Sequence, residues 1–463
     1  MERQSRNGQE TIVAVATPPG RGGIAVVRLS GPDSLRIARA LVRLKREPET
    51  HRVRFGHVLD EGGEVLDDAL LTYFAAPHSY TGEDVVEISV HGAPVVVQTV
   101  VQLSLRRGAR LAHAGEFTER AFLNGRMDLT QAEAVRDLIE SSTVAQARLA
   151  AEQLGGSLQR EVRPAKDALV MLVAALEAGI DFAEDDLQTM PTDEIAARIA
   201  ALRPALERLL ASFAHGRLLR EGLRLAIVGR PNAGKSSLFN KLLERDRAIV
   251  TPIPGTTRDV VSERAVIGDV PVELLDTAGL RETEDVVERL GVERSHEAIA
   301  DADLLLHVLD ATAADEEQEM AAAWVAAGRT PVVRVWNKAD LLPSEEREGA
   351  PEGALWTSAV TGEGMDALRG AILRYAGAGG AGAGSGTAAG AVHAMLTNTR
   401  QRDSIARALE GLERGAQAAL SGTPHEMLLL DLYEALQGLD ALTGQTTADD
   451  VLNQIFSTFC IGK

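Results

Sequence analysis

Apolar residues recur along the chain at intervals that change at three places. Residues 11–125 contain short β-like runs, such as "TIVAVAT" and "VVEISV", separated by Gly and Pro turns and one helical stretch. From about 128 to 220 the apolar positions have helical spacing. Strand–helix alternation then runs from "LRLAIVG" to about residue 377, after which helical spacing resumes. The pattern predicts an N-terminal α/β domain and a helical domain into which a second α/β domain is inserted.

The predicted boundaries follow these changes. The tract "AGAGGAGAGSGTAAGA" at 376–391 has too few bulky side chains to pack a core, which is typical of a flexible linker. The extension before Thr11 is expected to be disordered. The expected parts are an N-terminal domain at 1–125, the first helical half at 126–221, the inserted domain at 222–376, the linker at 377–391 and the second helical half at 392–463.

One helix start is predicted from capping residues. Thr130 and Glu133, in "DLTQAEAV", have the spacing of a capping box, in which the hydroxyl and the carboxylate each accept a backbone N–H. We therefore expect a helix to begin here with Thr130 as its cap.

Composition limits the classes of partner. The net charge of −19 disfavours a surface that coats nucleic acid broadly. The charge is uneven, since residues 1–60 carry eleven Lys or Arg against six Asp or Glu, whereas residues 281–320 carry three against thirteen. The acidic run is most simply a solvated face. Any contact with nucleic acid is thus expected to be local or made through a partner.

The expected cellular compartment follows from features that the sequence lacks. Cys460 is the single cysteine, which excludes an intrachain disulfide and favours a reducing environment. No apolar run approaches the roughly 18 residues of a spanning helix, and the first residues contain no apolar signal segment. A cytoplasmic protein without membrane contact is expected.

A phosphate-binding loop follows the first strand of the inserted domain. The stretch "GRPNAGKSS" fits G-x-x-x-x-G-K-[ST] between a strand and a helix. Backbone N–H groups of such a loop and the helix N-terminus favour phosphate oxygens. Lys235 is expected to reach the β and γ phosphates, and Ser236 to ligate Mg²⁺. The predicted nucleotide contacts of this loop are Asn232, Ala233, Gly234, Lys235, Ser236 and Ser237.

A second motif, "LLDTAG", ends an apolar strand with Asp276, where a carboxylate holds the outer shell of Mg²⁺. Gly279 can offer its N–H to the γ-phosphate. Leu280 stands where many GTPases carry a water-positioning glutamine, so another group must orient the attacking water. Glu288 is a candidate, and a solvated helix charge is the alternative from the residues alone. The contacts predicted for this motif are Asp276, Thr277, Ala278 and Gly279.

Two further motifs select the base. "VVRVWNKAD" ends a strand with Asn337, Lys338 and Asp340, and a carboxylate there can accept both the N1–H and the exocyclic amine of guanine. Adenine presents no such pair of donors. "WTSAVTGEG" places Ser358 and Ala359 in a loop that can close over the base. The four motifs together predict a guanine nucleotide site.

The segment "TPIPGTTRDV" resembles switch I of the translation-factor-related GTPases that use potassium. The resemblance implies that Thr257 ligates Mg²⁺ and that Asn232 holds K⁺, with Thr256 and the carbonyl groups of Thr251 and Ile253. A cation there can neutralise charge that develops in the transition state. Asn232 can alternatively be an ordinary turn residue. The expected nucleotide contacts are Thr251, Pro252, Ile253, Pro254, Gly255, Thr256 and Thr257.

Motifs on both sides of the inserted domain resemble the MnmE (also TrmE) family of tRNA-modification GTPases, over essentially the whole chain. They are "TIVAVATPPGRGGIAVVRLSG" (11–31), "SYTGEDVVEISVHGAP" (79–94), "GEFTERAFLNGRMDLTQAEAV" (115–135) and the terminal "CIGK". The resemblance implies a Ras-like P-loop GTPase domain inserted into the helical domain, and an N-terminal domain that dimerises and binds a tetrahydrofolate, either the 5-formyl or the 5,10-methylene form.

The family's activity needs a partner. The resemblance implies that the chain acts with MnmG (also GidA), an FAD-containing flavoprotein that uses NADH, as a heterotetramer. Together they would add an aminomethyl or carboxymethylaminomethyl group to C5 of the wobble uridine of certain tRNAs.

The resemblance also implies site residues. Folate contacts fall on Arg28, Glu87, Arg126 and Lys463, and the switch II carboxylate that orients water falls on Glu288. Family members often have Lys where Arg126 stands, and Arg pairs with carboxylates in a forked geometry that Lys lacks. From periodicity alone, the two arginines read as surface charges and Glu87 as an outward strand residue.

Cys460 has two interpretations. It follows Phe456 and Phe459 at the border of an apolar helical stripe that also contains Val451, Leu452 and Ile455, so it can be a small buried residue. Alternatively the terminal "CIGK" reaches the folate pocket, with Cys460 near the one-carbon unit.

Two other functions fit parts of the sequence. A potassium-dependent ribosome-assembly GTPase shares "GTTRD", but it would need an RNA-binding appendage that this acidic chain lacks. A scaffold whose dimer state is set by GTP needs no catalysis, and rapid K⁺-stimulated turnover would argue against it.

Overall fold

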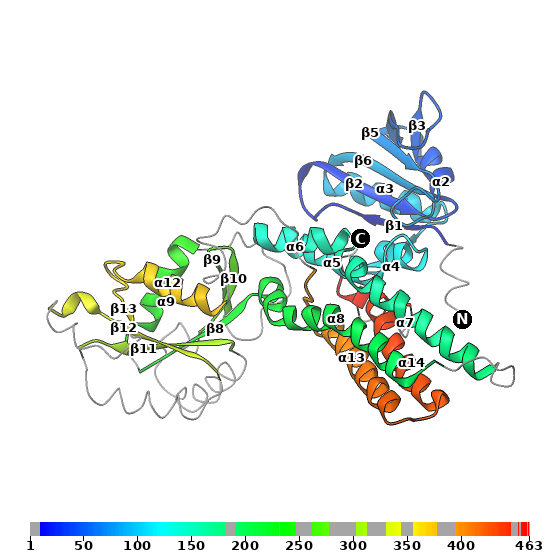
Figure 1. Cartoon of the computed structure of the whole chain (residues 1–463). Coiled ribbons are helices and arrows are strands. Elements are labelled where there is room, and N and C mark those ends of the chain that lie inside the picture. Colours follow the sequence, from blue (N-terminus) through cyan, green and yellow to red (C-terminus); the bar gives the residue numbers. More distant parts are fainter. Residues whose placement is uncertain are drawn as a thin grey trace, which may run out of the picture. The chain divides into compact units, whose positions relative to one another are not determined.

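The computed structural model describes residues 10–181, 190–230, 232–246, 262–276, 302–312, 330–343, 355–376, 394–445, 452, 455–460 and 462. The chain forms two compact units (Figure 1). The first contains residues 1–136, 153–160 and 429–463, and the second contains residues 137–152 and 161–428. Among the described residues, none of the helices combines the length and the apolar character that a membrane crossing requires.

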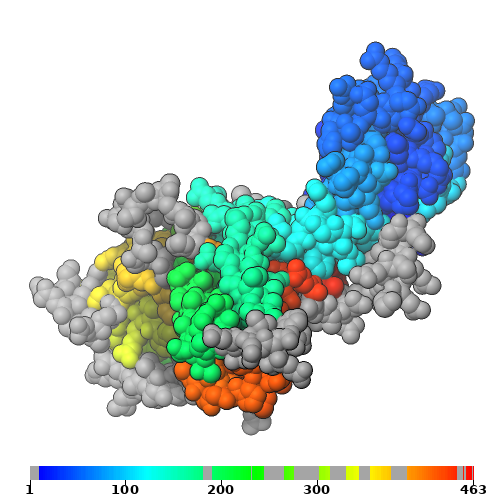
Figure 2. Space-filling model, turned by 45° about the vertical axis from the view of Figure 1, so that its right-hand side comes forward, coloured from blue at the N-terminus to red at the C-terminus, as the bar shows by residue number. Residues whose placement is uncertain are grey.

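The N-terminal part of the first unit is built on a seven-stranded sheet in the order β3-β4-β5-β6-β2-β1-β7. All neighbouring strands are antiparallel except β1 and β7, which are parallel. In Figure 2 the blue residues of this region form one closely packed body. The strands are β1 (Ile12–Val15), β2 (Gly22–Ser30), β3 (Val42–Leu44), β4 (Val53–Leu59), β5 (Val65–Phe74), β6 (Val85–Gly92) and β7 (Arg110–Leu111).

Alternation of side chains gives this sheet two different faces. Helices α2 (Ser34–Leu41) and α3 (Pro94–Arg106) cover one face, where Val27, Leu71 and Ile88 belong to a buried apolar core. Arg28 and Glu87 are cross-strand partners in β2 and β6 and lie on the opposite face. Helix α4 (Glu116–Leu123) covers the β1 end of that opposite face through Phe117, which packs with Ile12 and Ala14.

The helical region joins segments that are far apart in the sequence. In the second unit, α8 packs along α13, and the Arg402 guanidinium lies 5.1 Å from the centre of the Phe213 ring. A Cβ on Gly216 would lie 2.2 Å from the carbonyl oxygen of Leu396, so only glycine lets the chain cross α8 there. The helices are α5 (Leu129–Glu140), α6 (Val144–Leu154), α7 (Ser157–Asp181), α8 (Thr192–Glu221), α13 (Thr399–Leu420) and α14 (His425–Thr443).

The predicted cap of α5 is wrong by two residues. Asp128 Oδ1 accepts the backbone N–H of Gln131 at 2.9 Å, and Thr130 donates its hydroxyl to the same oxygen at 2.6 Å. Asp128 is therefore the capping residue, since its carboxylate is a stronger acceptor for an N-terminal amide than the hydroxyl.

The inserted domain has a six-stranded sheet in the order β13-β12-β11-β8-β10-β9, parallel except for β9. Parallel strands bring the loops after their carboxyl ends to one edge of the sheet. The elements are β8 (Leu223–Val228), α9 (Lys235–Asp246), β9 (Ser262–Ile267), β10 (Val270–Asp276), β11 (Leu304–Asp310), β12 (Val332–Asn337), η1 (Ala339–Leu341), β13 (Leu355–Trp356) and α12 (Met365–Tyr375). The fold class expected from the sequence is confirmed, with an α/β domain inserted between α8 and α13.

Candidate functional site

The glycine-rich loop after β8 lies at the carboxyl edge of the parallel sheet. Gly234, with φ +88°, precedes Lys235, the first residue of α9. Ser236 and Ser237 are exposed in the first turn of α9, where unpaired N–H groups and the helix dipole favour an anion. The loop therefore has the local geometry of a phosphate cradle.

Two positions of this loop must be glycine because other atoms lie too close for a side chain. A Cβ on Gly229 would lie 2.2 Å from the carbonyl oxygen of Val308, and one on Gly234 would lie 2.2 Å from the Asn337 amide nitrogen. Asn232 has φ +67°, a left-handed conformation that asparagine tolerates better than most residues. The Lys235 ammonium donates to the carbonyl oxygens of Gly229 and Arg230, both at 2.8 Å, so it lies directly over the loop.

Asn337, at the end of β12, joins the phosphate loop to the base loop. Its side chain is 2% exposed; Nδ2 donates to the carbonyl oxygen of Ala233 at 3.0 Å, and Oδ1 accepts the N–H of Ala359 at 3.2 Å. One amide thus uses a donor and an acceptor to hold two loops together. This buried amide sets the spacing between the expected phosphate and base positions.

Lys338 is held by a residue that the sequence analysis did not single out. Its ammonium donates to Asp310 Oδ2, at the end of β11, at 2.6 Å. Burial raises the pKa of the Asp310 carboxyl, but the hydrogen bonds from Lys338 and Thr312 outweigh it and lower that pKa. The Lys338 backbone has φ +65°. Its pairing with Asp310 holds the aliphatic part of the Lys338 side chain beside the expected base position.

Asp340 is exposed within η1, two residues after Lys338, so its carboxylate can meet a base edge. The loop opposite is tightly bonded, since the buried Ser358 accepts the N–H of Gly362 at its carbonyl oxygen and the N–H of Thr361 at its hydroxyl. A Cβ on Gly364 would lie 1.8 Å from the carbonyl oxygen of Trp356, so glycine is required to close this loop. The arrangement leaves the Asp340 carboxylate on one side of the expected base position and the internally hydrogen-bonded Ser358 loop on the other.

Several predicted contacts lie outside the described residues. The side chain of Asp276 is likewise not described, although its backbone pairs with Ile227 in the sheet. The structure thus brings together the phosphate-loop, Asn337–Asp340 and Ser358–Ala359 predictions, and the switch residues remain predictions. The residues outside are Thr251, Pro252, Ile253, Pro254, Gly255, Thr256, Thr257, Thr277, Ala278, Gly279, Glu288 and Lys463.

A second polar cluster lies on the N-terminal sheet, around Arg28. The Arg28 Nε donates to Glu87 Oε1 at 2.9 Å, and Nη2 lies 2.8 Å from the same oxygen. The guanidinium lies 5.6 Å from the centre of the Tyr80 ring and 5.8 Å from that of Phe117. Within the described part of the chain, Glu87 Oε2 makes no hydrogen bond. The two predicted folate residues are therefore in contact, and one carboxylate oxygen can still accept a donor.

The other two predicted folate residues are placed differently. Arg126 is exposed just after α4, and its side chain lies against Gly82, where a Cβ would be 3.3 Å from Cγ of Arg126. Gly82 belongs to the same loop as Tyr80, so Arg126 lies next to the loop that covers Arg28. Lys463 is outside the described residues.

A buried ionic network holds that loop. Arg120 is 1% exposed; Nη1 donates to Glu83 Oε2, and Nη2 donates to Glu116 Oε1, both at 2.9 Å. Ser30 donates to the same Glu83 oxygen at 2.7 Å, and Tyr80 is bonded to Thr118 of α4 at 2.8 Å. Helix α4 thus fixes the loop carrying Tyr80 over Arg28. None of these residues was predicted from the sequence, although all of them fall within the motifs at 11–31, 79–94 and 115–135.

Acid titration of Glu116 is expected to loosen this network. Burial raises the pKa of the Glu116 carboxyl, but hydrogen bonds from Arg110 and from the His113 N–H, with the nearby Arg120 charge, lower it to about 2. Because this folded-state pKa lies below the ordinary 4.5, the contribution to stability is complete above pH 5 and is lost as the pH falls from about 5 towards 2. The loss amounts to about 3 kcal/mol. Thermal unfolding midpoints at pH 7, 5 and 3.5 follow the first half of this loss, about 1.5 kcal/mol.

The matched control for that titration is Glu64→Gln, which neutralises an exposed carboxyl in the β4–β5 turn. Glu116→Gln should lower the midpoint at pH 7 and flatten its fall between pH 5 and 3.5, whereas Glu64→Gln should follow the wild type. Parallel curves for wild type and Glu116→Gln would contradict this assignment.

The C-terminal segment packs in the first unit. Leu452, Phe456 and Phe459 are buried against Leu129 and neighbouring residues of α5, as the apolar stripe predicted. Cys460 is exposed, so the alternative of a small buried residue is wrong. Residues 455–457 are helical, but Cys460 is not, so it lies beyond the helical stripe predicted from the sequence. Val451 lies outside the described residues.

Gly462 brings the tail to the sheet. It has φ +102°, and a Cβ there would lie 2.2 Å from the carbonyl oxygen of Val15. Val15 is the last residue of β1 and pairs with Val27, next to Arg28. The tail therefore approaches the same end of the sheet as the Arg28 cluster.

Comparisons with known proteins identify relatives along the whole chain. Residues 129–460 match the family model described as the MnmE helical domain, and residues 11–126 match that of the GTP-binding protein TrmE N-terminus. A protein of Koribacter versatilis named tRNA modification GTPase MnmE is 53% identical over 461 residues, which cover 99% of this chain and 100% of the relative. A protein of the same name from Symbiobacterium thermophilum is 47% identical over 473 residues, covering 98% and 100%.

Among solved structures, Aquifex aeolicus Era bound to GDP.AlF4- is 27% identical, with 42% of this chain and 66% of that chain covered and a TM-score of 0.27.

Proposed function

Because the chain belongs to the MnmE family of tRNA modification GTPases, we propose that it hydrolyses GTP and takes part in modifying the wobble uridine of certain tRNAs. The observation that carries the GTPase part is the buried Asn337 amide, which joins the phosphate loop to the base loop. The full-length similarity to the two named relatives supports the tRNA part.

In GTP hydrolysis the phosphate loop would bind the β and γ phosphates through its N–H groups and Lys235. Ser236 in the first turn of α9 is exposed where a Mg²⁺ ligand is needed, and we propose Thr257 and the outer-shell Asp276 as its partners. The metal would supply charge neutralisation at the bridging phosphate oxygens. Asn232 is exposed in the loop and would hold K⁺ with Thr251, Ile253 and Thr256, and Glu288 would orient the attacking water.

Turnover tests that part directly. GTP hydrolysis measured in KCl and in NaCl should be much faster with K⁺, and Glu288→Ala should abolish it while GTP still binds. Hydrolysis that does not depend on K⁺ would remove the potassium site from the proposal. Loss of GTP binding in Glu288→Ala would remove the assignment of Glu288 as a water-orienting residue.

We further propose that the Arg28 cluster binds a tetrahydrofolate, in the 5-formyl or 5,10-methylene form. Glu87 Oε2 can accept from the donor edge of a pterin, and the partly exposed Tyr80 provides aromatic surface beside it. Arg126 and Lys463 would pair with the glutamate tail. The exposed Cys460 lies near the approach of the tail to β1 and would lie close to the one-carbon unit.

Arg28→Gln is expected to weaken 5-formyltetrahydrofolate binding about 10- to 100-fold, because Glu87 loses the cation that orients it. Isothermal titration measures the dissociation constant. Arg36→Gln is the matched control, since it removes one exposed arginine that also pairs with a carboxylate, Asp33. Equal affinity in Arg28→Gln and wild type would place the folate elsewhere.

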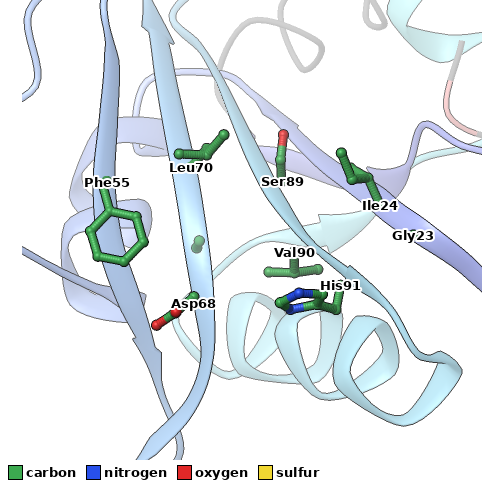
Figure 3. Close-up of a pocket in the computed structure, with 9 residues that line it drawn as sticks. Gly23, Ile24, Phe55, Asp68, Leu70, Ser89, Val90 and His91 are labelled. Carbon is green, nitrogen blue, oxygen red and sulfur yellow. The ribbon is translucent and has the colours of Figure 1, made fainter.

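The open part of the N-terminal sheet supports a homodimer. Ile24, Phe55 and Leu70 come from three strands and are 67%, 53% and 44% exposed, and Figure 3 shows them with Ser89 around a hollow of this face. Exposed apolar side chains that gather in this way are typical of a protein interface. We propose that a second copy covers this face, and that the partner flavoprotein MnmG, carrying FAD, joins the dimer in a heterotetramer.

A further inference from the structure

A basic surface surrounds the β3 edge of the N-terminal sheet. Between residues 39 and 54 the chain carries six Lys or Arg and two Glu, a formal charge of +4 in a protein whose net charge is −19. β3 is the outermost strand on this side and pairs only with β4 in the described sheet. We name this surface the β3 basic edge; its residues are Arg39, Arg43, Lys45, Arg46, Arg52 and Arg54.

The acidic residues nearby are already paired. Glu47 pairs with Arg39, and Glu49 pairs with both Arg52 and Arg54. In the turn between β4 and β5, Glu61 pairs with Arg106. On the open face, Asp68 forms a hydrogen bond with His57, the cross-strand partner of Arg43, and, among the described residues, no ion pair with a cation of the edge. These carboxylates therefore leave the remaining cations of the edge uncompensated.

Three cations within four residues remain. Arg43, Lys45 and Arg46 are all exposed, and within the described ranges their side chains make no ion pair or hydrogen bond. Arg43 is held on the rigid edge strand, and Lys45 and Arg46 follow directly after it. Unpaired cations placed side by side on a fixed element repel each other, so an anion with repeated charges is the ligand that stabilises them most.

We propose that the β3 basic edge binds the phosphodiester backbone of the tRNA. The inference rests on the proposed function, which supplies tRNA as the substrate, and adds the surface that positions it. Consecutive phosphates match a row of closely spaced cations better than the separated carboxylates of an acidic protein do. Such contacts carry no sequence information and would fix the position of the tRNA rather than choose among tRNAs. A local contact of this kind agrees with the strongly acidic remainder of the chain.

The test compares two triple variants of the full-length protein. Arg43→Gln, Lys45→Gln and Arg46→Gln together remove the unpaired cations. The control variant, Arg163→Gln, Arg198→Gln and Arg208→Gln, removes the same charge from exposed arginines of α7 and α8 that pair with carboxylates. Fluorescence anisotropy with labelled tRNA measures the dissociation constant between 50 and ~200 mM KCl.

The β3 variant should bind tRNA roughly 10- to 100-fold more weakly at 50 mM salt, and the slope of log affinity against log salt should fall by about 2. The control variant should bind like the wild type, and GTP turnover and dimer size should be unchanged in both. Equal loss in both variants would mean a general charge effect and would overturn the surface assignment. Wild-type affinity of the β3 variant for tRNA would also overturn the surface assignment.

Absence of tRNA binding in the wild type would instead contradict the proposed function, so the two failures are distinguishable. If tRNA binding is kept in the β3 variant while association with the flavoprotein is lost, the edge meets an acidic protein, and the phosphate assignment is overturned.

Discussion

Asp340→Asn is expected to weaken GTP binding at least about 100-fold and to give the site affinity for xanthosine triphosphate. Asp340 is exposed in η1 beside Lys338, where its carboxylate can accept two N–H donors of guanine. An asparagine offers an N–H donor in place of one acceptor, which matches the C2 carbonyl group of xanthine. Competition of unlabelled nucleotides against a fluorescent GDP measures both affinities.

Asp366→Asn is the matched control for that switch, because it replaces an exposed aspartate of α12, with a side chain 87% exposed, in the same domain. It should bind GTP as the wild type does. Wild-type GTP affinity in Asp340→Asn would mean that Asp340 does not read the base. Loss of GTP affinity without a gain in affinity for xanthosine triphosphate would mean that the substitution disturbs the loop in general rather than the recognition of the base.

Gly462→Ala is expected to reduce wobble modification at least about 100-fold while GTP turnover stays close to wild type. The new Cβ would lie 2.2 Å from the Val15 carbonyl oxygen, and the backbone angle φ of +102° disfavours any L side chain. The tail would leave the end of β1, and Cys460 and Lys463 would leave with it. Modified nucleosides formed in vitro with the flavoprotein partner are the readout.

The control for this variant separates backbone strain from lost docking. Gly63 has φ +80°, but a Cβ there would meet no atom within 4 Å. Gly63→Ala therefore carries the same kind of backbone cost without the collision, and it should modify tRNA at the wild-type rate. Full activity of Gly462→Ala would mean that docking of the tail is not needed for the reaction.

The sequence predicted best what depends on contiguous residues. A phosphate loop needs successive N–H groups and a helix start, so "GRPNAGKSS" contained the whole device, and Gly234 and Lys235 have the expected local geometry. The parallel sheet followed from strand–helix alternation. The family resemblance rested on equally local motifs, and the full-length relatives confirm it.

Contacts between separate elements were beyond the sequence pattern. The pairing of Lys338 with Asp310 depends on two strands ending at one level, and that of Arg120 with Glu83 depends on how α4 lies over the sheet. The cap of α5 was misassigned because Thr130 and Asp128 are both capping residue types. Only the geometry shows which of the two side chains accepts the backbone N–H of the helix. The exposure of Cys460 likewise depends on where the last helix ends, since residues 458–460 are not helical.

The central claim is that this GTPase serves wobble-uridine modification. Its most direct test is a mass-spectrometric profile of tRNA nucleosides from cells that lack the gene, complemented with wild type or with Asp340→Asn. The account predicts that C5-aminomethyl-type wobble uridines disappear in the deletion and return with the wild type but not with the variant. A deletion strain whose wobble nucleosides are unchanged would contradict it.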